Sequence, residues 1–312
     1  MNNALIKGFG ITALAAAVAA CGGSGSDDTA TGTASFDVTD APTMELAKVE
    51  ITFTGLSVKP ADGEAIEFTF DEAKTLDLLT LQGGDSAPLL EDQELPAGEY
   101  EWIRLTLDLD NSFVYETENP DAPLTLFVPS GAQTGLKLVS GFTIAQGGEN
   151  NFTIDFDVRK SIVNPQGKGV ADYFLKPALR LVDNLEVGSI TGQVDYATIN
   201  QARGSDDTED ALADCDYEGS VYVFEGADAE LSDLNVNNEE GNPLMVVPVE
   251  PDSESGLYSY KAAFLTEGNY TVAYSCQLDD NEQDDTLEFD GKQTVAVEAG
   301  VETEAETIPL AQ

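Results

Sequence analysis

The feature that most limits the fold of this chain is the alternation of apolar and polar residues over many short runs. The alternation is clear over residues 49–53, 66–70, 103–110 and 152–159, and glycine, proline and asparagine separate the runs. Since successive side chains of a strand point to opposite faces of a sheet, each run predicts a strand with one buried and one solvated face. The number of such runs predicts an all-β protein built from two antiparallel β-sandwich domains in tandem.

One irregularity interrupts this pattern near its start. The apolar positions run to Phe53 and then slip by one residue to Leu56 and Val58. Gly55 is the extra residue at the slip, and a β-bulge or a tight bend accounts for such a change of phase. Convincing helical patterns are few. Residues 71–81 are the best helical candidate, although they could equally hold another strand.

The N-terminal segment has the organisation of a bacterial lipoprotein signal peptide. Lys7 gives a positive start, an uncharged apolar run covers Ile11–Ala20, and Cys21 follows directly. The run is too short for a transmembrane span, which needs roughly 20 apolar residues. The segment resembles a lipobox, which implies that residues 1–20 are cleaved and that Cys21 is acylated, for example with palmitate. An ordinary signal peptide cleaved near Ala20 is the alternative.

The segment after the cysteine predicts how the protein is held. Residues 21–33 are rich in glycine, serine, threonine and aspartate, which predicts a flexible tether. In enterobacterial lipoproteins an aspartate directly after the cysteine retains the protein in the inner membrane. Position 22 is Gly22 here, so the resemblance implies a lipid-anchored outer-membrane protein that faces either the periplasm or the cell surface.

Composition limits the possible partners and chemistry. Residues 21–312 are long enough for two domains with cores of their own. The chain has 58 acidic and 14 basic residues, a net charge of -44, and such a surface repels nucleic acid and anionic lipid. It has no histidine, which excludes histidine-based triads and histidine metal or haem ligands.

The three cysteines divide into one lipid site and one pair. If Cys21 carries the lipid, Cys215 and Cys276 are the pair left within the chain, and an oxidising compartment predicts a disulfide between them. Two free buried thiols are the alternative. Cys276 shares one face of a predicted strand with Tyr270 and Tyr274, so it is expected to point into the core.

Residues 34–186 carry several motifs of a known family. They include Thr39–Pro42 after a first strand, Leu95–Tyr100 at the start of another, and Tyr173–Pro177 near the end. Together these motifs resemble the bacterial lipoprotein family catalogued as domain of unknown function 4382. The resemblance implies an envelope location and a β architecture, and it brings no activity and no assigned site residues.

Residues 187–312 form a second predicted domain. A first strand over Ile190–Val194 is followed by Gly256–Tyr260 and Phe264–Val272, in which a Gly-x-Tyr turn leads into a strand. This pattern is similar to the transthyretin-like, carboxypeptidase regulatory-like sandwiches. The resemblance implies a spacer or binding module without catalysis of its own.

Acidic residues are concentrated around the two cysteines and suggest a possible calcium site. Calcium prefers six to eight oxygen ligands, and a disulfide would bring the two acidic loops together. The candidate ligands are Asp206, Asp207, Asp210, Asp214, Asp216, Asp279, Asp280, Asp284 and Asp285. Neither loop fits the EF-hand pattern, and solvated acidic loops are the alternative in a protein this acidic.

Two further site types have candidate residues. A glycan-binding surface would need exposed aromatic residues, and Tyr217, Tyr222, Tyr258 and Tyr260 are the candidates. Trp102 is expected in the core. A carboxylate-dependent glycoside hydrolase is the remote alternative, with Asp108 and Asp110 or Asp155 and Asp157 as acid pairs. These acids are expected instead on the solvated faces of strands.

The sequence contains no Gly-x-Ser-x-Gly elbow and no glycine-rich phosphate loop before a helix. It therefore predicts a non-catalytic, lipid-anchored cell-envelope protein, a structural, adhesive or interaction module at the outer membrane. Its expected partners are the membrane, through the lipid, and an unidentified envelope or surface component. No resident cofactor is expected other than the possible calcium.

Overall fold

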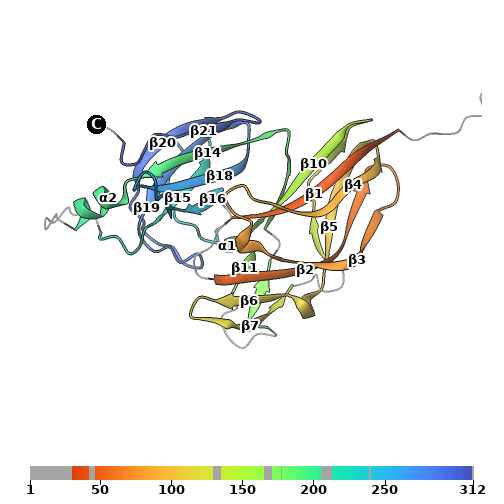
Figure 1. Cartoon of the computed structure of the whole chain (residues 1–312), viewed down its shortest axis with the longest axis horizontal. Helices are drawn as coiled ribbons and strands as arrows, with labels where there is room; N and C mark the ends of the chain where they lie inside the picture. Colours follow the sequence, from red (N-terminus) through yellow and green to blue (C-terminus); the bar gives the residue numbers. More distant parts are fainter. Residues whose placement is uncertain are drawn as a thin grey trace, which may run out of the picture.

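A computed structural model describes residues 30–41, 46–128, 135–164, 171–176, 178–204, 213–238 and 240–310. The chain folds into two β units that lie against each other, and the connection between them follows Asp183 (Figure 1). Strand pairing in the described residues stays within residues 31–183 or within residues 187–304. The all-β sandwich architecture predicted from the alternation is confirmed. Among the described residues, no helix is long and apolar enough to cross a membrane.

The first unit consists of two sheets. The four-stranded sheet has the order β13 (Leu179–Asp183), β10 (Glu149–Asp157), β1 (Thr31–Ala41), β4 (Ala87–Pro96). The nine-stranded sheet has the order β11 (Ile162–Val163), β12 (Tyr173–Leu175), β7 (Asn119–Phe127), β6 (Phe113–Glu116), β2 (Leu46–Pro60), β5 (Gly98–Leu107), β8 (Leu136–Leu138), with β3 (Ile66–Asp77) on β2 and β9 (Phe142–Ile144) on β5. The short helical segments are η1 (Leu78–Thr80), η2 (Leu109–Asn111) and α1 (Val158–Ser161).

The second unit consists of two four-stranded sheets and one helix. One sheet has the order β17 (Glu250–Pro251), β18 (Tyr258–Thr266), β14 (Val187–Val194), β21 (Glu302–Glu304). The other has the order β16 (Met245–Pro248), β15 (Ser220–Glu225), β19 (Gly268–Ser275), β20 (Asp290–Val297). Helix α2 (Tyr196–Arg203) follows β14.

Three strand pairs are parallel, where alternation alone predicts antiparallel neighbours. They are β1 with β10, β7 with β12, and β14 with β21. Each joins strands that are far apart along the chain, and parallel neighbours require such crossover connections. The period-two pattern identifies a strand but carries no information about the direction of its neighbour.

The core of the first unit lies between its two sheets. Phe36 of β1 stacks on Phe152 of β10, with ring centroids 5.4 Å apart, and Phe142 meets both rings edge-on. Phe53 of β2 contacts Phe156 of β10 in the same way at 6.1 Å. Aromatic pairs in such geometry add to the stabilisation that burial itself provides. The apolar positions of the predicted strands therefore form one continuous core.

Gly55 lies at a β-bulge, as the slip in the alternation predicts. The register of β2 shifts between Phe53 and Gly55 against both β3 and β5. A Cβ atom at Gly55 would lie 2.5 Å from the backbone oxygen of Phe68, so the close approach of β3 needs a glycine here. Residues 71–81 hold the end of β3 and then η1, whose first turn is capped by the Asp77 carboxylate, so the helical alternative for this segment is wrong.

Residues 31–33, predicted to belong to the tether, instead form the start of β1. Thr31 pairs with Pro96 and Thr33 pairs with both Glu94 and Glu149. Composition alone misplaces the end of the predicted tether. Glycine and threonine favour a flexible segment, but backbone hydrogen bonds to β4 and β10 hold residues 31–33 in a strand. Residues 1–29, including Cys21, lie outside the described residues.

Asp155 is not on a solvated face, contrary to the sequence expectation. Only 9% of the residue is exposed, and its carboxylate binds Arg180, with Nη2 2.6 Å from Oδ2. Burial raises the pKa of Asp155, and the Arg180 charge opposes that rise. The cause is the second unit, since Asp155 lines a small cavity together with Met245 and Lys261. The second unit thus covers the part of the outer face of the β13-β10-β1-β4 sheet around Asp155.

The bulge gives a test of the fold. Gly55→Ala is expected to cost about 1–3 kcal/mol in free energy of unfolding, because the added methyl group overlaps backbone that belongs to another strand. Gly141→Ala is the matched control, since its Cβ would lie 3.5 Å from the nearest backbone oxygen, an ordinary contact. Urea unfolding measures both. Equal losses in the two variants would contradict the assigned packing.

Candidate functional site at the junction of the two β units

The most extensive buried polar cluster joins the two units. Arg159 of α1 reaches from the first unit to Asp279 of the second, with Nη2 3.3 Å from Oδ2. The Asp279 side chain is 1% exposed. The same oxygen accepts hydrogen bonds from the Tyr222 hydroxyl at 2.8 Å and from the Leu234 amide at 3.2 Å. One carboxylate from the predicted acidic loop is therefore held inside the protein.

Helix α1 carries further contacts across the junction. The Asn281 side-chain amide donates to the carbonyl oxygen of Arg159 at 2.6 Å. The Lys160 ammonium donates to the carbonyl oxygens of Pro243 and Leu244 at 2.9 and 3.1 Å. Asp157 caps the helix through the Lys160 amide. The single turn of helix after β10 thus places two adjacent cations, Arg159 and Lys160, in contact with the second unit.

Burial is the largest cause of the pKa shifts in this cluster. It raises the pKa of Asp279, while the Arg159 charge and the hydrogen bonds from Tyr222 and Leu234 oppose the rise. The second carboxylate oxygen, Oδ1, is buried without a hydrogen-bond partner among the described residues. Burial and the neighbouring Asp279 also raise the pKa of Tyr222 strongly, so its hydroxyl stays protonated and serves as a donor.

A polar cleft of about 640 Å³ lies between the two units. The turn at residues 79–85 forms one wall, and β14, β18 and the β16–β17 segment form the other. Its charged lining residues are Asp85, Glu250, Glu304 and Lys261. Lys261 pairs with Glu302 at 2.8 Å. The lining is largely polar and contains hydroxyl residues such as Ser259 and Tyr260 beside these charges.

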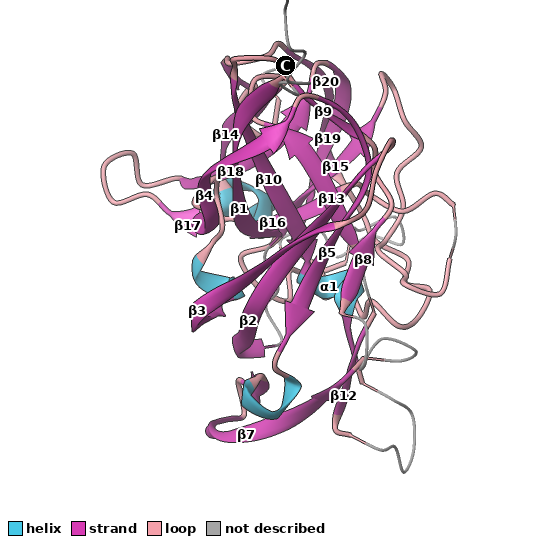
Figure 2. Ribbon diagram, turned by 90° about the vertical axis from the view of Figure 1, so that its right-hand side faces the viewer, coloured by secondary structure: helices cyan, strands magenta, loops and turns pink. Residues whose placement is uncertain are grey.

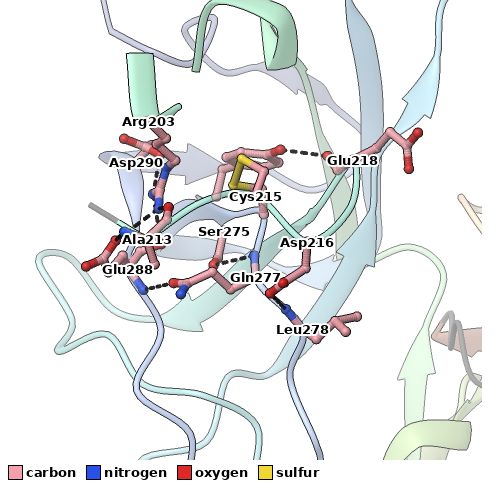
Figure 3. Close-up of a disulfide and its surroundings, with 12 residues drawn as sticks. Arg203, Ala213, Cys215, Asp216, Glu218, Ser275, Gln277, Leu278, Glu288 and Asp290 are labelled. Atoms are coloured by element: carbon pink, nitrogen blue, oxygen red, sulfur yellow. Dashed lines mark hydrogen bonds and ion pairs between the residues drawn. A yellow bond between two sulfur atoms is a disulfide. The ribbon is translucent and has the colours of Figure 1, made fainter. Parts of the chain in front are cut away.

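The predicted disulfide between Cys215 and Cys276 is present (Figure 3). The Cα atoms of Cys215 and Cys276 are 4.9 Å apart, and 61 positions separate the residues. Cys276 is fully buried in the core of the second unit with Tyr270 and Tyr274. The disulfide and the inward direction of Cys276 are both confirmed.

Arg203 organises the acids beside the disulfide, and the sequence reasoning missed it. Its side chain is 1% exposed and binds Glu288 at 3.0 Å and Asp290 at 2.8 Å. It also donates to the Ala213 carbonyl oxygen at 2.9 Å (Figure 3). The available signal was a lone arginine at the end of α2, directly before an acidic run. Such a cation is the natural counter-charge for buried carboxylates.

The candidate calcium ligands that the structure describes do not gather into one site. Asp216, Asp280, Asp284 and Asp285 accept hydrogen bonds from protein N–H groups of neighbouring turns. Asp279 belongs to the junction, and Asp214 is exposed. Asp206, Asp207 and Asp210 lie outside the described residues. Across the part of the chain that the structure describes, no group of three or more acidic or cysteine residues could hold a metal ion.

The aromatic candidates do not form an exposed patch. Tyr222 is fully buried and Tyr260 is 4% exposed, and Tyr217 and Tyr258 are half-buried. The expectation for Trp102 is also wrong, since this residue is half-buried on the outer face of a sheet rather than in the core.

Comparison with known proteins identifies one part of the chain. Residues 31–177 match the family model described as "Domain of unknown function (DUF4382)", which confirms the resemblance inferred for this part of the chain from its motifs. The lipoprotein signal and the transthyretin-like resemblance of the second unit stay predictions. No curated protein matches the chain.

Several solved structures show a distant similarity. A leucine-rich repeat protein from Bacteroides thetaiotaomicron is 14% identical, with a TM-score of 0.22 over 90% of this chain and 26% of its own. The minor pilin of Streptococcus agalactiae is 9% identical, with a TM-score of 0.18 over 89% of this chain and 98% of its own. The fimbrial anchor protein Mfa2 of Porphyromonas gingivalis is 10% identical, with a TM-score of 0.18 over 77% of each chain. At these TM-scores none of them bears on the function of this chain, which spans about a quarter of the first.

The junction gives a test with a defined pH dependence. Arg159→Gln leaves the Asp279 carboxylate buried without its counter-charge, which is expected to cost about 3 kcal/mol at neutral pH. The folded-state pKa of Asp279 is already raised, and the substitution raises it further. The cost should therefore shrink as the pH falls through the raised folded-state pKa, and it is lost below the ordinary carboxyl pKa of about 4, where the group becomes neutral in both states.

Urea unfolding of the two proteins at several pH values measures this difference. Lys261→Gln is the matched control, because the Lys261–Glu302 pair is exposed and is expected to contribute about 0–1 kcal/mol. A pH-independent loss in Arg159→Gln would contradict the assigned charge pair.

The disulfide gives a second test. Replacing Cys215 and Cys276 together by alanine is expected to cost about 4 kcal/mol on the chain-entropy estimate for a loop of this length. Equilibrium unfolding under oxidising conditions measures the loss. A double variant as stable as the wild type would show that the disulfide does not change the free energy of unfolding.

Proposed function

We propose that this protein is a non-catalytic, lipid-anchored module of the bacterial cell envelope, held at the outer membrane by Cys21. The contacts at the junction of the two units are the main support for this proposal. There the charges of Arg159, Lys160 and Asp279 are directed at the opposite unit and bind it. These groups fasten two β units into one body, which suits a structural, adhesive or interaction role better than chemistry.

The anchor supplies the physical link to the membrane in this proposal. A single acyl chain holds a protein weakly, whereas two or more chains hold it stably, at roughly 0.8 kcal/mol for each buried methylene. The net charge of -44 opposes flat contact with anionic lipid. The two units would then stand away from the bilayer and present their surfaces to an envelope or surface partner.

Two substitutions test the anchor and the sorting separately. Cys21→Ser is expected to release the protein from the membrane fraction, because the lipid attachment site is lost. Gly22→Asp is expected to keep the protein in membranes but move it to the inner-membrane fraction. Density-gradient fractionation with immunoblotting measures both. Retention of the Cys21→Ser protein in the outer-membrane fraction would refute lipid anchoring.

Calcium binding by the acidic loops stays a prediction that thermal unfolding can test. Because Asp216, Asp280, Asp284 and Asp285 already accept protein hydrogen bonds, we expect calcium and magnesium to shift the melting temperature equally at fixed ionic strength. A shift of several degrees with calcium alone would instead establish a site, since a ligand at 100 times its Kd stabilises by about 2.7 kcal/mol.

A further inference from the structure

The single tryptophan of the chain lies on the outer face of the nine-stranded sheet. The register between β2 and β5 shifts at Lys59 and Pro60, opposite Trp102 and Tyr100. Tyr100 and Ile103 are buried on either side of this irregularity, while Trp102 is half-buried. Trp102 alternates with the buried Ile103 and Leu105, so its indole lies on the outer face of the sheet, whereas the register shift brings Tyr100 to the core side.

Two cations lie over this indole. The guanidinium carbon of Arg104 and the ammonium nitrogen of Lys137 are each 4.7 Å from the ring centroid. Arg104 and Lys137 are register partners on the neighbouring strands β5 and β8 (Figure 2). Lys59 of β2 pairs with Trp102 from the other side. Two of the chain's 14 basic residues thus lie against one aromatic ring.

The Arg104 and Lys137 charges have no acidic partner in the described part of the chain. Arg159 and Arg180, in contrast, pair with Asp279 and Asp155. Arg104 and Lys137 also differ from single exposed lysines in lying over the same indole. Lys59 approaches Glu101 only at 3.8 Å. The Arg104 Nε atom is buried without a hydrogen-bond partner among the described residues. With 58 acidic residues available, two adjacent unpaired cations are a specific arrangement.

We propose that Trp102, Arg104 and Lys137 form a binding site for a single oxyanion group, a carboxylate, sulfate or phosphate, carried by an otherwise neutral ligand. Stacking on the indole holds the guanidinium in one plane, so its remaining N–H groups can bind a planar or tetrahedral oxyanion along their edge. The Lys137 ammonium adds a second donor. This site is independent of the junction and of the lipid anchor.

The charge of the rest of the protein selects for one oxyanion rather than a polyanion. A net charge of -44 repels an extended polyanion, because many carboxylates then face many ligand charges. A single group feels mainly the nearby cations, since salt screens charges beyond about 8–10 Å. An acidic sugar unit and a free inorganic anion both supply this chemistry.

Trp102 reports directly on this site, because it is the only tryptophan. The full chain in a nonionic detergent is titrated with sodium sulfate, inorganic phosphate and sodium glucuronate at constant ionic strength, while tryptophan emission is recorded. Glucose serves as the neutral partner of glucuronate. We expect a saturable change with at least one oxyanion and none with glucose. A response to glucuronate alone assigns the site to acidic sugars, and a response to sulfate or phosphate assigns it to inorganic anions or their esters.

Variants separate binding from a general salt effect. Arg104→Gln and Lys137→Gln are expected to weaken the apparent affinity about tenfold each, because each removes one charge-assisted contact. Lys48→Gln is the matched control, since Lys48 also lies over an aromatic ring but pairs with Glu50, and its affinity should stay within about twofold. Circular dichroism confirms folding of each variant. No saturable response to any oxyanion, or an unchanged response in both Arg104→Gln and Lys137→Gln, overturns the proposal.

Discussion

The two-unit structure depends on one buried ion pair, Arg159 with Asp279. Taking both charges out of water is costly, and their attraction offsets that cost only if further hydrogen bonds are made. The Tyr222 hydroxyl and the Leu234 amide provide these bonds on the aspartate, and Asn281 binds the backbone of α1. Because removal of either charge leaves the other unpaired, the pair fixes how the units meet.

The contact between the two units also buries a polar residue on the outer face of the four-stranded sheet in the first unit. A sandwich sheet normally has one solvated face, yet the β13-β10-β1-β4 sheet buries Phe156 on one side and Asp155 on the other. Asp155 is tolerated there because Arg180 neutralises it. Beside the disulfide the relation is reversed, since the buried Arg203 is neutralised by the half-buried Glu288 and Asp290. A chain with 58 acids and 14 bases thus uses several of its few cations where carboxylates are removed from water.

The alternation of apolar and polar residues predicted the features that depend on neighbouring positions in the sequence. The strands, the bulge at Gly55 and the inward direction of Cys276 follow from alternation, and the disulfide follows from counting cysteines. The junction could not be predicted, because Arg159 and Asp279 are 120 positions apart and each alone looks like a solvated charge. Trp102 was misassigned because the general tendency of tryptophan to be buried was preferred to the alternation, which places it opposite the buried Ile103 and Leu105.

Whether the units behave as one body is the central claim, and cooperativity of unfolding tests it most directly. Urea unfolding of the full chain would be followed by Trp102 emission, which reports on the first unit, and by hydrogen exchange of the β15 and β19 amides, which reports on the second. The buried junction predicts one coincident transition for both probes. Two transitions separated in urea concentration would contradict the account and leave the units as independent domains on one chain.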